Sequence, residues 1–308
     1  MGVVADSTPV VSSPAAEVES PWRRVASEFV RSRLAVAGLV LLAIAVVLAL
    51  AAPWLSPQNP YDLAQLDVMD SKLPPGASAS ATSRTYWLGT DDQGRDMLSG
   101  ILYGLRISLT VGVTSTVIAL AIGLALGLTA AYFGGWADAA IMRLADIQLS
   151  FPSILIALIL LAILGQGVDK IIVALVTVQW AYYARTVRSA AMVERQKEYV
   201  EAARALALSR MRIVFRHLLP NCMPPLIVVA TVQVAHAISL EATLSFLGLG
   251  LPITEPSLGL LIANGYQYLL SGKYWISFYP GVALLLTIVA INLVADQLRD
   301  ILNPRLRK

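Results

Sequence analysis

Charged residues are scarce in this chain of 308 residues, where they make up 14% of the sequence. A typical soluble domain is about 25% charged and about 45–50% apolar, whereas 57% of this chain is hydrophobic. A soluble domain of this size would need far more charge on its surface. The composition therefore excludes an ordinary soluble domain and indicates an integral membrane protein.

Cysteine and histidine are nearly absent as well. Cys222 is the single cysteine, which excludes a disulfide framework and a cysteine-ligated zinc cluster. His217 and His236 are the only histidines, and they lie too far apart in the chain for a local metal motif. We expect no metal and no cofactor.

Motifs for nucleotide binding and hydrolysis are missing from the sequence. Without a Gly-x-x-x-x-Gly-Lys-Ser/Thr loop, the chain cannot bind ATP by that route. The polar cluster TDDQGRD at 90–96 raises the possibility of metal or acid–base chemistry. A capped turn explains it better, with Asp side chains as caps, Gly94 at the turn and Arg95 paired. The sequence therefore predicts that the protein is not an enzyme.

Long uncharged runs are the dominant feature of the sequence. A helix needs about 20 apolar residues to cross a hydrocarbon core of about 30 Å. The strand alternation of a β-barrel is missing, so we predict an all-α protein with six transmembrane helices. The runs are 34–55, 107–137, 147–168, 171–184, 218–251 and 274–295, of which the fourth is the shortest.

Lysine and arginine predict the orientation of these helices. With the N-terminus inside, 17 of the 23 basic residues fall in inner segments and six in outer segments. Both termini are therefore expected in the cytoplasm. The predicted organisation is a disordered tail (1–22), a first transmembrane region (23–56), an extracytoplasmic segment with little regular structure (57–104), a permease core (105–296) and a cytoplasmic tail (297–308).

The long inner loop contains the sequence EYVEAARALALSRMRIVFRHLLPN at 198–221. It resembles the EAA loop of bacterial ABC importer permeases. The matching residues are Glu201, Ala202, Ala203, Arg204, Ala207 (where glycine is usual), His217, Leu219 and Pro220. Alanine can replace this glycine where the turn does not need a positive φ angle. The resemblance implies a short helix that docks on a partner ATPase, and small side chains suit close backbone approach.

More of the chain is similar to one branch of that family, the dipeptide/oligopeptide permeases of the C-subunit type. The similar segments are LGTDDQGRDMLSGILYGLRISLTVG (88–112), YFGGWADAAIMRLADIQLSFPS (132–153), EATLSFLGLGLP (241–252) and PGVALLLTIVAINLVADQLRDILNPRLR (280–307). Gly100, Ala295 and Asn303 depart from the residues common there. The resemblance implies the type I importer permease fold, with an added first helix and a five-helix core, in the bacterial inner membrane.

This resemblance also implies partners. They are a second, homologous permease, two ATP-binding subunits and an extracytoplasmic solute-binding protein; no nucleic acid is expected. Peptides are the expected solute, with nickel and glutathione as alternatives known in related permeases.

Ionisable residues inside predicted spans are candidates for function, because burying charge in a membrane is costly. For Asp146, the spacing favours a structural pair with Arg143. Gln233 and His236 share a helical face and are candidates for the pathway, although a helix–helix contact is favoured. Glu241 is a candidate pathway or gate residue, or it stabilises a helix break near Gly248 and Gly250.

Two other classes remain as rivals. An ion-coupled secondary transporter would use Asp146, His236 or Glu241, but the sequence shows no inverted repeat with paired broken helices. A membrane enzyme would need a nucleophile or metal constellation at one membrane depth, and no such constellation is visible.

Overall fold

The computed structural model describes residues 21–62, 65–80 and 84–302. Within the predicted terminal tails, residues 1–20 and 303–308 lie outside the described residues. The described chain folds mainly into helices, as lipid-exposed backbone requires. The helices are α1 (Pro21–Arg31), α2 (Arg33–Leu55), α3 (Met97–Phe133), α4 (Gly135–Ser150), α5 (Ser153–Leu164), α6 (Val168–Glu194), α7 (Glu198–Ala205), α8 (Arg210–Arg212), α9 (Leu219–Phe246), α10 (Leu258–Tyr266) and α11 (Trp275–Leu302).

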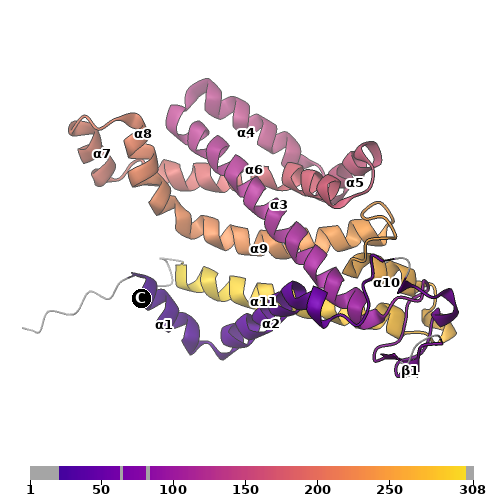
Figure 1. Cartoon of the computed structure of the whole chain (residues 1–308). Helices are drawn as coiled ribbons and strands as arrows, with labels where there is room; N and C mark the ends of the chain where they lie inside the picture. Colours follow the sequence, from indigo (N-terminus) through magenta and orange to yellow (C-terminus); the bar gives the residue numbers. More distant parts are fainter. Residues whose placement is uncertain (1–20, 63–64, 81–83, 303–308) are drawn as a thin grey trace, which may run out of the picture.

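The long helices run between two ends of the molecule (Figure 1). One end carries α7 and α8, together with the start of α1 and the described end of α11. The opposite end carries α10 and a small hairpin. Helix α3 crosses the middle and packs on α6, α9 and α2, while α2 packs on α11.

Small residues let α3 and α6 approach closely. A Cβ atom on Gly123 would lie 2.4 Å from Cβ of Tyr183, and one on Gly127 would lie 2.6 Å from the carbonyl oxygen of Ala184. This spacing of two glycines four residues apart is typical of close helix contacts in membranes. The backbones of α3 and α6 therefore lie close together at Gly123 and Gly127.

Four described helical stretches are long and apolar enough to cross a membrane, or five if a bent pair counts as one span. The four are Arg33–Leu55, Met97–Phe133, Arg210–Phe246 and Trp275–Leu302, and the bent pair is α4 with α5. The sequence predicted six spans. The difference is α6, which is 27 residues long but carries Asp169, Lys170, Arg185 and Arg188, and is not among the candidate spans.

The prediction of one continuous span over 147–168 is wrong. The structure breaks there between α4 and α5, which meet at 91°. Pro152 has no backbone N–H and disfavours helical geometry in the residue before it. Phe151 accordingly adopts an extended conformation, with φ −97° and ψ 144°. The neighbouring helix α3 also begins ten residues before the predicted run, at Met97.

The segment between α2 and α3 has little regular structure, although the predicted bounds 57–104 include the first turns of α3, which begins at Met97. It contains a short 3₁₀ turn, Val68–Asp70, and an antiparallel pair of two-residue strands. These strands are β1 (Ala77–Ser78) and β2 (Thr85–Tyr86), with Ala77 opposite Tyr86. A side-chain hydrogen bond joins β2 to the 3₁₀ turn: the Tyr86 hydroxyl donates to Asp70 Oδ2 at 2.8 Å.

The TDDQGRD cluster is a capped turn, as expected from the sequence. Asp91 Oδ1 accepts hydrogen bonds from the backbone nitrogens of Gln93 and Arg95, and Asp96 caps α3 by accepting from Ser99 N at 2.8 Å. Arg95 does not form the expected pair with an acid. Its guanidinium donates to Gln93 Oε1 and to the carbonyl oxygen of Ile253, so it joins this turn to the loop before α10.

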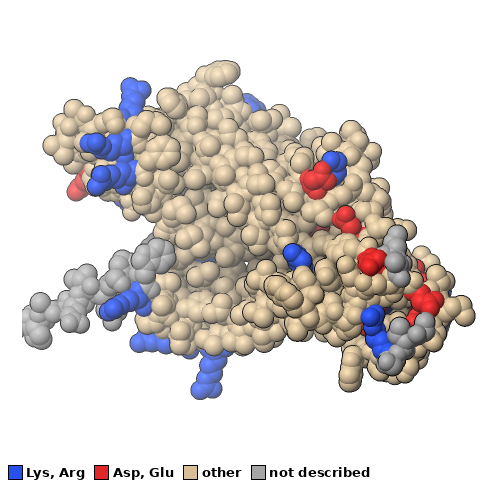
Figure 2. Space-filling view, in the orientation of Figure 1, with Lys and Arg blue, Asp and Glu red and all other residues tan. Residues whose placement is uncertain are grey.

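Basic residues gather at the end of the molecule that carries α7 and α8, and acidic residues are prominent at the other end (Figure 2). This asymmetry matches the excess of basic residues expected on the cytoplasmic side. The orientation in which α7 faces the cytoplasm stays a prediction from the sequence.

Candidate coupling loop and pathway residues

Helix α7 forms the tip of the inner loop, beyond the end of α6 (Figure 1). Val200 and Ala203 are buried and join an apolar cluster with Ile213 and Leu218 on the segment that leads into α9. Glu201, Ala202 and Arg204 are exposed on the other side. The loop therefore presents a short amphipathic helix whose exposed face carries both charges and small residues.

The turn after α7 depends on Ala207, which has a positive φ angle of 52°. Leu208 N donates to the carbonyl oxygen of Ala203 at 3.2 Å, which closes the end of the helix. This geometry is typical of helix ends where glycine is preferred, because a Cβ atom is disfavoured there. The sequence left open whether this turn needs a positive φ angle. The structure shows that it does, and Ala207 adopts the glycine-like conformation.

His217, Leu219 and Pro220 lie behind α7, where the inner loop joins α9. His217 belongs to a short π-helical stretch, and its carbonyl oxygen accepts from Asn221 Nδ2 at 2.7 Å. Pro220 lies just after this stretch, inside the continuous helical segment Arg210–Phe246, and it has no backbone N–H to donate to the preceding turn. These residues shape the junction and do not share the exposed face of Glu201.

Tyr199 connects three parts of this loop, and the sequence reasoning missed it. Its hydroxyl donates to Glu194 Oε2 at 2.7 Å and accepts from Asn221 Nδ2 at 3.2 Å. Partial burial and the bond to Glu194 raise the pKa of Tyr199 to about 12. The side chain thus ties α7 to the end of α6 and the start of α9; only the folded loop shows this.

Large apolar side chains are exposed in this loop and were also missed. Leu206 is 74% exposed directly after α7, and Met211 and Phe215, on the segment that leads into α9, are 66% and 55% exposed. Exposed apolar residues among charged ones are typical of interaction sites. We define Leu206 together with Glu201 and Arg204 as the α7 surface.

Of the pathway candidates, Glu241 is fully buried. Its carboxylate accepts hydrogen bonds from Ser108 Oγ of α3 at 2.9 Å and from Ser245 Oγ at 2.8 Å. These bonds connect α3 with the end of α9, just before the chain breaks at Gly248. The arrangement suits the alternative in which Glu241 stabilises that break, and a gate role stays a prediction.

Gln233 and His236 have side-chain atoms without hydrogen-bond partners in the described structure. Gln233 is 7% exposed and its Nε2 atom is unpartnered, as is Nδ1 of the half-buried His236. Buried polar atoms usually have partners. Their role in the pathway is still a prediction, and these unpartnered atoms are its structural support.

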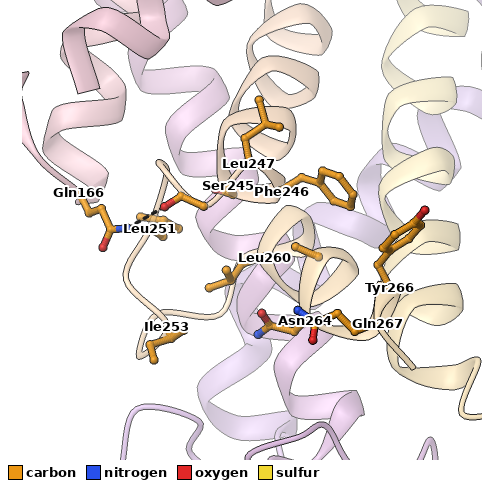
Figure 3. A pocket seen from close by; sticks show the side chains of 12 residues that line it. Gln166, Ser245, Phe246, Leu247, Leu251, Ile253, Leu260, Asn264, Tyr266 and Gln267 are labelled. Atoms are coloured by element: carbon orange, nitrogen blue, oxygen red, sulfur yellow. Dashed lines mark hydrogen bonds between the residues drawn. The ribbon is translucent and has the colours of Figure 1, made fainter. Parts of the chain in front are cut away.

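A pocket of about 630 Å³ lies at the outer end, between the end of α9, α10 and the loop before α6. Asn264 of α10 and Gln267, directly after this helix, lie on one side and Gln166 on the other (Figure 3). Gln166 Nε2 donates to the carbonyl oxygen of Gly248 at 2.8 Å, whereas Asn264 Nδ2 has no partner among the described residues. The lining is uncharged, with amide groups beside apolar side chains.

No group of His, Cys, Asp or Glu among the described residues could hold a metal ion.

The class of protein follows from a structural similarity. The chain superposes on the permease chain of a structure titled "Inward facing conformations of the MetNI methionine ABC transporter", with a TM-score of 0.54 and 24% identity. The match covers 67% of this chain and 98% of the other. The fold is therefore that of an ABC importer permease.

The family follows from the sequence comparisons. Residues 119–308 match the family described as "Binding-protein-dependent transport system inner membrane component", and residues 20–75 match the "N-terminal TM domain of oligopeptide transport permease C". The chain belongs to the family of binding-protein-dependent transport system inner membrane components. It is a non-catalytic membrane component of a bacterial transport system and is located in the inner membrane. Membership of this family implies binding-protein and ATPase partners in general.

Similar proteins extend over nearly the whole chain. The dipeptide transport system permease protein DppC of Escherichia coli K12 is 40% identical, covering 97% of both chains. The di/tripeptide transport system permease protein DppC of Pseudomonas aeruginosa is 38% identical, covering 96% of both. DppC of Alkalihalophilus pseudofirmus is 36% identical, covering 97% of this chain and 96% of that protein.

Proposed function

We propose that the chain is one permease subunit of an ATP-driven importer for di- or oligopeptides, and that it forms half of the translocation pathway. The observation that carries the solute class is the similarity, at 36–40% identity over almost the full length, to permeases of dipeptide and di/tripeptide systems. The uncharged amide and apolar lining of the outer pocket also suits a peptide backbone with side chains.

The proposed membrane topology has six spans. Helix α2 is the added first span, and α3, the bent pair α4–α5, α6, α9 and α11 form the core. This keeps the organisation expected from the sequence, with a core over 105–296 after an extracytoplasmic segment. Its support is the position of α6 against α3, since 27 residues at 1.5 Å each span about 40 Å.

The proposed assembly contains a second, homologous permease, two ATP-binding subunits and an extracytoplasmic binding protein. The α7 surface supports the ATPase contact, because Leu206 is 74% exposed directly after the helix that exposes Glu201 and Arg204. Apolar anchors next to charged groups are the arrangement expected at a specific protein interface.

Coupling then depends on how α7 is held. When the two ATPases close on ATP, they push on α7 of each permease. Because Tyr199 bonds both Glu194 and Asn221, the displacement is passed to the ends of α6 and α9 together. The paired permeases open outward, and hydrolysis resets them. Glu201 to Ala207 act in this mechanical contact.

The test is co-purification from membranes in mild detergent. The wild-type chain should carry one homologous permease and two ATPase chains. Glu201→Lys reverses a charge on the α7 surface and should release the ATPases and abolish peptide uptake, while the second permease remains bound. Asp300→Lys, the same change of charge near the end of α11, is the matched control and should retain both.

A chain that purifies without any ATPase, in wild-type form as well, would contradict the importer assignment. Retention of the ATPases by Glu201→Lys with normal uptake would contradict the coupling role of α7 alone. Normal assembly without uptake of peptides would leave the importer in place and overturn the solute class.

A further inference from the structure

The outer pocket is built from three elements that lie far apart in the sequence (Figure 3). The end of α9 and the turn after it contribute residues 245–248, α10 contributes Leu260 and Asn264 among others, and the loop before α6 contributes Gln166. Its volume is about 630 Å³. Pockets that bind small molecules have volumes of roughly 300–1,000 Å³, so this one is large enough for a small solute.

Close contacts fix the walls of this pocket. A Cβ atom on Gly259, in the first turn of α10, would lie 2.3 Å from the carbonyl oxygen of Ala242 on α9. A Cβ atom on Gly250 would lie 2.3 Å from Ser245 Oγ, and this hydroxyl donates to the buried carboxylate of Glu241 at 2.8 Å. Since tightly packed backbone and buried hydrogen bonds resist displacement, the walls are pre-formed.

Two side-chain amides give the pocket unused hydrogen-bonding groups. Asn264 Nδ2 is buried and has no partner among the described residues. Gln166 donates through Nε2 to the carbonyl oxygen of Gly248 at 2.8 Å, which leaves its Oε1 atom as an acceptor. The two amides lie on different sides of the pocket (Figure 3). Because buried polar atoms normally have partners, the pocket presents a donor and an acceptor to a ligand.

The rest of the lining is mostly apolar and includes two aromatic rings, those of Phe246 and Tyr266. None of the described residues that line the pocket is charged. Charged pairs lie elsewhere: Asp146 of α4 pairs with Arg185 of α6, in place of the Arg143 partner expected from the sequence. A buried charge needs an opposite charge to offset its lost hydration. The pocket therefore favours an uncharged ligand group.

We propose that this pocket is a subsite for the uncharged part of a peptide, formed by one peptide bond and an apolar side chain beside it. Asn264 Nδ2 donates to the peptide carbonyl oxygen, and Gln166 Oε1 accepts from the peptide N–H. These two groups point away from opposite sides of a trans peptide bond. The charged ends of the peptide stay in water at the mouth, so the subsite does not read them. The inference rests on the proposed function.

The first experiment measures occupancy of the pocket by protection of a thiol. In a Cys222→Ala background, Ala263→Cys places a thiol in the lining, and Ser271→Cys, an exposed position beyond α10, is the matched control. The transporter, assembled with its second permease and its ATPases in lipid nanodiscs, is treated with a small thiol reagent. Saturating dileucine should slow labelling of Ala263→Cys at least about tenfold, because pockets bury most of a ligand's surface. It should leave Ser271→Cys unchanged.

The chemistry of the subsite is tested with two further peptides. Diglutamate has two charged side chains and should protect Ala263→Cys far less than dileucine at the same concentration. Dileucine blocked at both ends should protect as well as free dileucine, because the ends are not read. Equal protection by diglutamate, or loss of protection on blocking the ends, would overturn the uncharged subsite.

Other occupants of the pocket would give different results. Protection by the binding protein without peptide would show that the pocket receives a loop of that protein, which would overturn the proposal. A thiol at position 263 that stays unlabelled in every form would show that the second permease or lipid covers the pocket. That result would overturn the proposal as well.

The second experiment replaces the unpartnered amide. Asn264→Leu keeps the approximate size of the side chain and removes its hydrogen-bonding atoms. The melting temperature should not fall, because Nδ2 has no partner to lose. In the Ala263→Cys background, the dileucine concentration that gives half protection should rise about tenfold, since the bond to the peptide is lost. A lower melting temperature with unchanged protection would show that Asn264 only stabilises the fold.

Uptake of dileucine into proteoliposomes that contain the wild-type transporter and its binding protein is measured in parallel. Uptake without protection at position 263 would overturn the subsite and leave the peptide importer in place. Absence of both uptake and protection would overturn the peptide assignment too. The two proposals can therefore fail separately.

Discussion

The two ends of the molecule manage polar groups in opposite ways. At the outer end, Asp91, Arg95 and Asp96 are at most 1% exposed and are bonded within the chain. At the inner end, Glu201 and Arg204 are exposed beside Leu206, which is 74% exposed. The outer network is closed off from solvent, and part of it has no hydrogen-bond partner among the described residues: Asp91 Oδ2, Arg95 Nε, Arg95 Nη1 and Asp96 Oδ1. The inner loop instead leaves charged and apolar side chains exposed.

This difference separates stability from assembly. Changes at the outer end should mainly affect folding, because a buried network loses partners when one member changes. Changes on the α7 surface should mainly affect the contact with the ATPase. The following variants test this contrast, from the largest expected effect to the smallest.

Gly94→Ala should disrupt the outer segment most strongly. Gly94 has φ +78°, and a Cβ atom there would lie 2.1 Å from the carbonyl oxygen of Asp67. We expect a loss of at least about 3 kcal/mol of stability. Limited proteolysis from the outer side should show faster cleavage within 57–96, with a lower melting temperature.

Gly76→Ala is the matched control for Gly94→Ala. Gly76 has a similar φ of +83° but nothing within 4 Å of the added carbon. It should cost only the conformational penalty, about 1–2 kcal/mol. Equal effects for both variants would show that contact with Asp67 does not hold the turn.

Asp91→Asn should change the pH dependence of the outer end. Burial raises the pKa of Asp91 from 3.8 to about 6. Between these values the folded state binds a proton that the unfolded state does not, so stability falls as the pH rises. Relative to Asp91→Asn, the wild type should lose roughly 2 kcal/mol between about pH 4 and pH 7.

The measurement for Asp91 is the melting temperature of both proteins across that pH range. Asparagine keeps an oxygen that can accept from Gln93 N and Arg95 N, so the turn should persist. Other titrating groups, such as Asp70 and Asp96, cancel in the comparison. Parallel curves for the two proteins would show that Asp91 does not titrate in this window.

Ala207→Gly should have the smallest effect, at the inner end. Ala207 has a positive φ of 52°, which glycine adopts without strain, and this relief should stabilise the loop by about 1 kcal/mol. The greater conformational entropy of glycine in the unfolded chain offsets part of this gain. Ala202→Gly, inside α7, should instead destabilise it by about 1 kcal/mol. Hydrogen exchange of the backbone over 198–208 measures both, and the same sign for both would contradict the strained turn.

Local signals in the sequence predicted the chemistry of both ends. The charged loop with Glu201 and the capped turn around Gly94 follow from residue types at short spacing. The structure contains both, except that Arg95 bonds Gln93 and Ile253 and not an acid. The family assignment also followed from such segments. The break at Pro152 was available to the same reasoning, but counting uncharged residues alone concealed it.

What the sequence by itself determined is therefore the membrane class, the α7 helix and the family. Tertiary structure decided which groups meet across helices: Asp146 with Arg185, Glu241 with Ser108, and Tyr199 with Asn221. The physical reason is that hydropathy and helical spacing are properties of one segment. A charge in a span takes its partner from whichever helix packs beside it, and this packing is set by close contacts such as Gly123 on Tyr183, far apart in the chain.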